Sequence, residues 1–182
     1  MPGNAFIQFK GVTKGESLAD SHKGSDGWNE ISDWSWDIEA ETSFLKGSGA
    51  AVGKPTPGTF SITHPYDTAA PAIMTRIVMG THFDEVQLVM LKQTGAADGK
   101  GEIYFGAVMK QVFITKVSSK GGEDGSVSQD VEFVFKEISI GYRPQMPNGG
   151  LDKQMPFGWN ISAMKTEGVT PPDIKSLTKS LG

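Results

Sequence analysis

Four short segments of the sequence alternate apolar and polar side chains with a period of two. Every second position in them is aliphatic or aromatic: Ala5, Ile7, Phe9; Trp34, Trp36, Ile38; Val86, Leu88, Met90; and Val131, Phe133, Phe135. Successive side chains of a strand point to opposite faces, so this pattern is typical of half-buried β-strands. Residues 111–117 are β-branched or aromatic at both parities, which predicts a strand covered on both faces. The chain is therefore expected to be mainly β, a small antiparallel β-barrel or sandwich.

Residues 67–80 have a different period. Asp67 or Thr68 can accept the first free N–H groups of a helix, Pro71 is tolerated in its first turn, and Gly80 suits a left-handed C-terminal position. One face of this helix is apolar: Ile73, Met74, Ile77 and Val78. We expect one short α-helix over 67–80, whose apolar stripe closes an open end of the barrel.

A long segment of low apolar content, residues 41–58, separates two predicted strands and includes several glycines and two prolines. Ordering about 16 such residues costs roughly 16 to 30 kcal/mol. The apolar surface is too small to offset this at about 25 cal/mol per Å². By itself this extended loop should be mobile. It is either an arm that becomes ordered by pairing with a neighbour's sheet edge or a flexible surface loop with no partner.

The last part of the chain is rich in proline and glycine. Residues 157–161 can dock a short strand back onto the barrel, whereas the last dozen residues are expected to be loosely held. The tail is too short for a second domain. We therefore divide the chain into a barrel domain, 1–145, and a C-terminal extension, 146–182.

Composition excludes several classes of function. The chain of 182 residues has no cysteine, so it can form neither a disulfide nor a thiol nucleophile. Its 17 basic and 21 acidic residues give a net charge of −4, which argues against nucleic acid as a partner. The N-terminus lacks the basic and apolar regions of a signal peptide, and no apolar run is long enough for membrane insertion.

No motif for catalysis, a cofactor or a metal stands out. His22, His64 and His82 lack metal-like spacing, although His64 and His82 flank the predicted helix and could meet in space. The glycines of 95–101 fit a hairpin turn better than a phosphate loop, and no Gly-x-Ser-x-Gly elbow occurs. We predict a non-enzyme with no catalytic residue, cofactor or metal site.

Several segments resemble, in order, the Hcp family, the tube protein of the bacterial type VI secretion system. These are Lys14-Gly15-Glu16-Ser17, Trp34-Ser35-Trp36, Asp67 with Pro71, Gly80-Thr81-His82, the Gly121-Gly122-Glu123-Asp124 connection, Tyr142-Arg143-Pro144-Gln145 and Gly158-Trp159-Asn160. The sequence departs from the family pattern in three places: His64-Pro65 replaces a more usual basic residue, Gln129 stands where glutamate is common, and the tail past Trp159 is longer than in many members. These departures bear on local ion pairs and on the role of the final residues.

The resemblance implies a phage tail-tube-like barrel that forms homohexameric rings, which stack into a hollow tube expelled by a contractile sheath. It further implies contact with a VgrG-type spike and baseplate, and effector proteins carried in the lumen. Such a protein is cytoplasmic while the tube is assembled and is then secreted without a signal peptide.

For the sites, the resemblance places Ser35 on or near the lumen wall, where it would meet effectors. The segment 41–58 becomes the candidate for contact with the next ring, through Thr42, Phe44, Lys46, Gly47, Gly49, Val52, Gly53 and Lys54. A different reading is a monomeric, secreted β-sandwich that binds carbohydrate or protein through Trp28 and Trp34.

Overall fold

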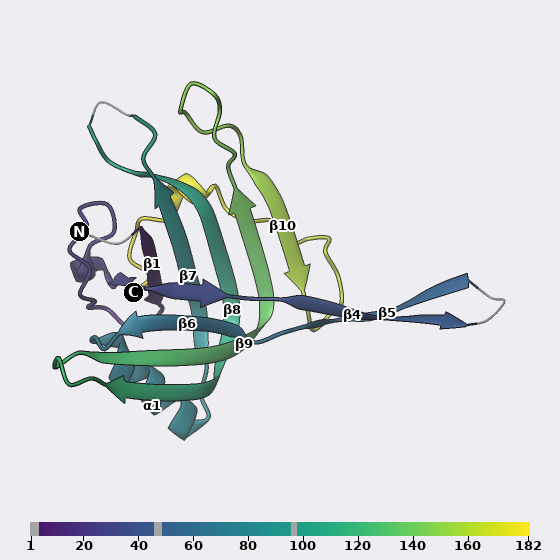
Figure 1. Cartoon of the computed structure of the whole chain (residues 1–182), viewed down its shortest axis with the longest axis horizontal. Coiled ribbons are helices and arrows are strands. Elements are labelled where there is room, and N and C mark those ends of the chain that lie inside the picture. Colours follow the sequence, from purple (N-terminus) through teal and green to yellow (C-terminus); the bar gives the residue numbers. More distant parts are fainter. Residues whose placement is uncertain (1–3, 46–48, 96–97) are drawn as a thin grey trace.

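The computed structural model describes residues 4–45, 49–95 and 98–182, and only the backbone of 43–45 and 49–52. Eight strands of the described chain form one strongly curled antiparallel sheet in the order β2-β1-β7-β8-β9-β6-β3, with β10 also beside β9 (Figure 1). The strands are β1 Ala5–Phe9, β2 Asn29–Glu30, β3 Asp33–Ser35, β6 Phe60–Pro65, β7 Phe83–Lys92, β8 Glu102–Gly121, β9 Val127–Tyr142 and β10 Met155–Asn160. The predicted mainly β, antiparallel architecture is confirmed.

The curl originates in the two longest strands, β8 and β9. Gln111 of β8 has a φ of 52°, and the pairing of β8 with β9 shifts between Ile114 and Lys116. A left-handed residue and a bulge bend a strand, so β8 leaves β7 after Val112 and continues beside β9 alone. On its other side, β9 pairs with β6 near its start and with β10 near its end.

The two end strands of the sheet, β2 and β3, are consecutive in the chain. Between them, Ile31 N–H donates to Ala5 O (3.1 Å), and Ser32 N–H donates to Thr63 O (2.8 Å). This corner therefore connects β1 to β6 and brings the sheet round on itself.

The main core lies inside the curl. Alternate residues of the strands fill it, including Ile7, Phe9, Leu88, Phe133 and Ile138, all at most 1% exposed. The expectation that residues 111–117 are covered on both faces is wrong. Val112 and Ile114 are buried, but Thr115 and Lys116 are exposed, because the C-terminal tail covers the outer face near Phe6, Val89 and Val108 and not this half of β8.

The helix α1 spans Ala69–Met79, close to the prediction. Asp67 Oδ1 accepts from Ala69 N–H at 2.9 Å, and Gly80 ends the helix at a φ of 67°. The predicted apolar face is only partly correct. Ile73 is buried and Ile77 half-buried, but Met74 and Val78 are 39% and 82% exposed.

The buried face of α1 is instead completed by small residues. Ala69 and Ala70 are both buried, and Ala69 and Ile73 join the main core. Alanine lets the helix approach the sheet closely, so the face that carries Ala69, Ile73 and Ile77 turns inward. Met74 and Val78 each follow one residue later, about 100° further round the helix axis, and so they turn outward.

The C-terminal extension packs on the outer face of the sheet. Phe6, Val89 and Val108 point outward there and are buried beneath Ile174 and Leu177, next to a fully buried Trp28. The short 3-10 helix η2, Ile174–Ser176, carries this contact, while another, η1 Gly24–Asp26, lies in the loop before Trp28. Strand β10 docks on β9, as expected for 157–161.

Hydrogen bonds between side chains of the body and the backbone of the tail also hold the last residues. Trp28 Nε1 donates to Thr178 O (3.2 Å), Gln8 Nε2 donates to Lys179 O (2.7 Å), and Leu181 N–H donates to Gln8 Oε1 (3.2 Å). The expectation of a loose final dozen residues therefore differs from the structure. Two apolar side chains three residues apart suffice to cover an apolar sheet face that would otherwise meet water.

Candidate assembly surfaces

An arm projects from the curled sheet (Figure 1). It consists of β4, Ile38–Leu45, and β5, Gly49–Pro57, paired antiparallel from Ile38 opposite Pro57 to Leu45 opposite Gly49. We expected this segment to lack structure without a neighbour. The pairing differs from that expectation because the two halves of the segment supply each other's backbone hydrogen-bond partners.

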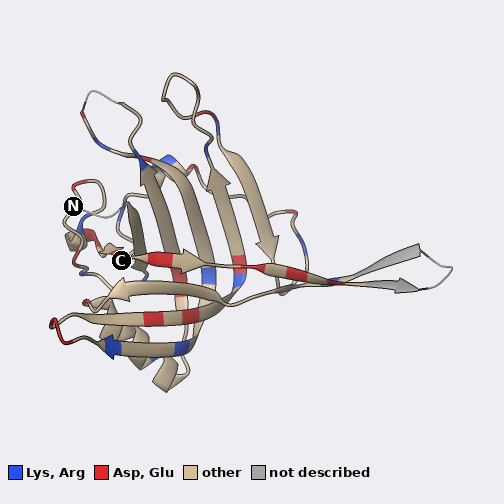
Figure 2. Cartoon of the chain, in the orientation of Figure 1, with Lys and Arg blue, Asp and Glu red and all other residues tan. Residues whose placement is uncertain are grey.

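Six of the eight predicted stacking residues lie on these two strands. Thr42 and Phe44 are on β4, while Gly49, Val52, Gly53 and Lys54 are on β5. Lys46 and Gly47 are outside the described residues. Figure 2 shows acidic residues gathered where the arm leaves the body, and Glu39 and Glu41 are exposed there.

Besides the short end strands β2 and β3, two longer strand edges of the curled sheet are free in the described part of the chain. Residues 113–121 of β8 pair with β9 on one side and with no strand on the other, and β10 pairs with β9 alone. Near these edges, apolar side chains are exposed: Val78 and Met79 of α1 at 82% and 69%, and Met155 and Phe157 of β10 at 52% and 38%. The molecule thus presents two unlike surfaces, each able to extend a sheet and bury apolar area.

Ser35 ends β3 and is exposed, opposite Ser61 of β6. Its neighbours in sequence point the other way. Trp34 stacks on Phe60 at 5.5 Å and on Phe105 at 5.0 Å between ring centroids, and Trp36 Nε1 donates to Gly58 O. The position is a surface one, as a lumen wall requires.

The tryptophans do not form an open platform. Trp28 is 0% exposed and belongs to the outer-face cluster, whereas Trp34 packs partly buried against the main core. These two rings lie in different clusters on opposite faces of the sheet. A binding surface built from Trp28 and Trp34 is therefore ruled out.

A buried polar cluster joins β6, β9 and the start of α1. His64 Nδ1 lies 3.0 Å from Asp67 Oδ2, and His64 Nε2 lies 2.8 Å from Gln129 Oε1. Burial opposes protonation of His64, but these hydrogen bonds and the charge of Asp67 outweigh it and raise the pKa of the imidazole. His64 and Gln129, two positions at which the sequence departs from the family pattern, thus contact each other directly.

The histidines do not converge. His22 lies between Phe6 and Trp28, with ring centroids 5.2 and 4.6 Å away, while His82 is near Asp84 and Phe113. Among the described residues, no group of three histidine or acidic side chains could hold a metal ion. Within the same part of the chain, no helix is long and apolar enough to cross a membrane.

Sequence reasoning missed the outer-face cluster. Its only signal was the spacing of Ile174 and Leu177, an i, i+3 apolar pair in a polar tail, together with Phe6 between two core positions. Such a pair indicates an amphipathic turn, but it does not identify the surface that the turn covers.

Comparison with known proteins agrees with this architecture. The profile of the family described as "Type VI secretion system effector, Hcp" matches residues 6–142. No curated protein matches the chain at a significant level.

Among solved structures, a type six secretion system protein is 25% identical with a TM-score of 0.77, covering 88% of this chain and 97% of that one. Hcp1 from Salmonella typhimurium is 26% identical with a TM-score of 0.68, covering 91% and 99%. A type VI secretion system effector from Yersinia pestis, 23% identical with a TM-score of 0.61, covers 86% and 99% and shares the fold. The profile match spans most of the chain, and the matched structures each cover 86% or more of it. The chain belongs to the Hcp family of type VI secretion system proteins.

Proposed function

We propose that this protein is the ring-forming subunit of the type VI secretion tube. The observation that carries the proposal is the pair of unlike free edges, β8 with α1 on one side and β10 on the other. When one copy's first surface meets the next copy's second surface, the contact is heterologous, and it closes into a ring if the rotation divides a full turn. Family membership favours a homohexamer.

The arm is our candidate for contact between rings. Its two strands pair only with each other in the described chain, so each keeps an outer edge to which another sheet can add. Ring faces that stack do not close on themselves, so the contact propagates into a tube. We place Thr42, Phe44, Lys46, Gly47, Gly49, Val52, Gly53 and Lys54 in this contact.

In this proposal the tube is assembled in the cytoplasm on a VgrG-type spike and baseplate, inside a contractile sheath. It leaves the cell when the sheath contracts, with effector proteins in its lumen and Ser35 on or near the lumen wall. The role is structural and cargo-binding, and no catalytic step is assigned to any residue.

Deleting residues 47–53 tests the arm. We expect the variant to form hexamers in analytical ultracentrifugation, but to form no tubes in electron micrographs and to be absent from culture supernatants. Tubes and secretion at the normal level would refute the assignment. A wild-type protein that stays a monomer across the concentration range would refute the ring itself.

Substituting Ser35 tests the lumen position. Ser35→Gln should leave the hexamer intact and reduce export of some effectors, because a longer side chain narrows the lumen. Ser25→Gln, at an exposed position of η1, serves as the matched control. Normal export of every effector by Ser35→Gln would show that the residue lies elsewhere.

A further inference from the structure

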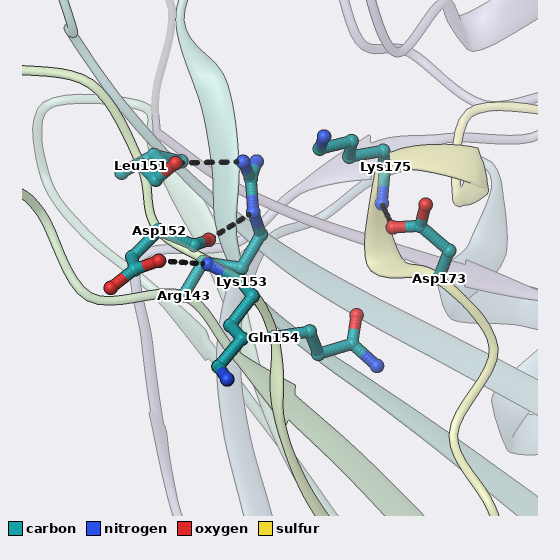
Figure 3. A pocket seen from close by; sticks show the side chains of 7 residues that line it. All are labelled: Arg143, Leu151, Asp152, Lys153, Gln154, Asp173 and Lys175. Carbon is teal, nitrogen blue, oxygen red and sulfur yellow. Dashed lines mark hydrogen bonds between the residues drawn. The ribbon is translucent and has the colours of Figure 1, made fainter.

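A pocket of about 480 Å³ lies between the loop after β9 and the C-terminal tail (Figure 3). Its polar lining comes from both segments: Arg143, Asp152, Lys153 and Gln154 from the first, and Asp173 and Lys175 from the second. All six lie beyond the region that matches the family profile, which ends at residue 142. The pocket therefore lies where the C-terminal extension meets the end of the barrel domain, which contributes Arg143.

Arg143 is a buried cation without a counter-ion in the described chain. Its side chain is part of a residue only 6% exposed; Nε donates to Asp152 O (3.0 Å) and Nη2 to Leu151 O (3.2 Å). Both acceptors are neutral backbone carbonyls. Nη1 is buried with no hydrogen-bond partner, and no carboxylate of the described residues lies within ion-pair distance of the guanidinium. A buried charge of this kind is costly unless an anion pairs with it.

The acids that line the pocket are occupied by their own backbone. Asp152 Oδ1 accepts from Lys153 N–H at 2.7 Å, and Asp173 Oδ1 accepts from Lys175 N–H at 3.1 Å. The lining of the pocket carries three cationic side chains and two carboxylates, an excess of one positive charge. In Figure 3 the guanidinium of Arg143 lies between Leu151 and Lys175.

Gln154 fixes the distance between the two walls. Its Nε2 donates to Pro172 O (3.0 Å), and its Oε1 accepts from Ile174 N–H (2.8 Å). Because Ile174 is itself anchored in the outer-face cluster, Lys175 is held at the rim of the pocket. The fold thus holds the backbone of both pocket walls in place before any ligand binds, whereas the side chains of Lys153 and Lys175 are exposed.

We propose that this pocket binds a carboxylate, held by Arg143 and flanked by Lys153 and Lys175. A guanidinium with an unused donor suits a planar carboxylate oxygen, and lysines add charge without a fixed geometry. The neighbouring Asp152 and Asp173 repel a dianionic phosphate more strongly than a singly charged carboxylate. The carboxylate comes either from a small free acid or from an acidic protein segment. The site is independent of the ring proposal, since every group belongs to one chain.

Two probes distinguish the sources: acetate, and the peptide acetyl-Glu-Glu-Glu-amide, with acetyl-Gln-Gln-Gln-amide as the neutral control. The signals of the Arg143 guanidinium and the Lys175 amide are followed in ¹H–¹⁵N spectra at low salt. Saturable shifts with the glutamate peptide alone identify a protein segment as the source, and shifts with both probes identify a free carboxylate. The proposal is overturned if neither probe shifts these signals up to about 10 mM, an upper limit for weak binding, or if the glutamine peptide shifts them equally.

Charge neutralisation provides the second readout. The double variant Lys153→Gln/Lys175→Gln leaves the backbone contacts of the pocket in place and should weaken binding about five-fold or more. Lys120→Gln, an exposed lysine at the end of β8, should bind as the wild type does. Unchanged affinity of the double variant would contradict the assignment, whatever the protein's oligomeric state.

Discussion

Leu177 in the C-terminal tail should stabilise the whole domain, and replacing it with alanine tests how the tail is held. The side chain is 4% exposed and packs in the cluster that contains Phe6, Trp28 and Ile174. Truncation of a buried leucine to alanine costs about 2 to 5 kcal/mol, through lost transfer free energy and the cavity left behind. The cluster is thin, with one turn of chain over the sheet, so partial collapse is possible. We therefore expect the lower end of this range, about 2 to 3 kcal/mol.

For a domain of this size, about 2 to 4 °C in Tm corresponds to 1 kcal/mol, so the expected decrease is about 4 to 12 °C. The matched control is Leu18→Ala, the same change at a position that is 92% exposed. That variant should stay within about 0.5 kcal/mol of the wild type.

Urea unfolding at one fixed protein concentration measures both variants. The concentration must be constant because association stabilises the folded state by mass action. Equal stability losses in Leu177→Ala and Leu18→Ala would refute the reasoning, since the tail would then contribute no more than an exposed side chain. A loss confined to faster proteolysis of residues 170–182, with unchanged global unfolding, would show that the tail is an independent unit.

The remaining predictions concern strain, pH and close packing. Gln111→Gly should be neutral or stabilise the fold by up to about 1 kcal/mol in urea unfolding, because a φ of 52° is unfavourable for a side chain with a Cβ; a clear loss would mean that the amide itself contributes. Burial lowers the pKa of His22, against the opposing hydrogen bond to Leu177 O, so the unfolded chain binds a proton that the folded chain does not. The contribution of His22 to stability should therefore fall as the pH falls from about 7 to 5, opposite in sign to that of His64, whose pKa is raised. Compared with the wild type, His22→Gln should lose less stability over this range; an identical pH profile would contradict the assignment. Gly158→Ala places a Cβ against the backbone oxygen of Val169 and should cost about 1 to 3 kcal/mol in urea unfolding, whereas Gly121→Ala, with nothing nearer than 4.0 Å, should be tolerated in the same assay.

Local periodicity was a good guide to the elements. The alternation at Ala5, Ile7 and Phe9 and at Val131, Phe133 and Phe135 identified β1 and β9, since a strand's side chains alternate whatever the strand later pairs with. The residues around 67–80 identified α1 and its ends because caps depend on atoms within one turn.

Periodicity was less reliable in predicting which faces of a helix or strand are buried. Met74 and Val78 are as apolar as Ile73 but are exposed, and residues 111–117 are covered on one face only. Burial is decided by the element that arrives on the other side, and that element is distant in sequence. The carboxylate pocket has the same origin, because Arg143 and Lys175 are brought together only by the docking of the tail.

By itself, then, the sequence determined the strands, the helix, the lack of thiol chemistry and, through its ordered motifs, the Hcp family. Only the tertiary structure decided that the segment 41–58 pairs with itself, that Trp28 lies under Leu177, and that His64 contacts Gln129. The physical reason is one of range. Backbone conformation follows from neighbours within a few residues, whereas burial, hydrogen-bond partners and free edges depend on contacts between residues far apart in the chain.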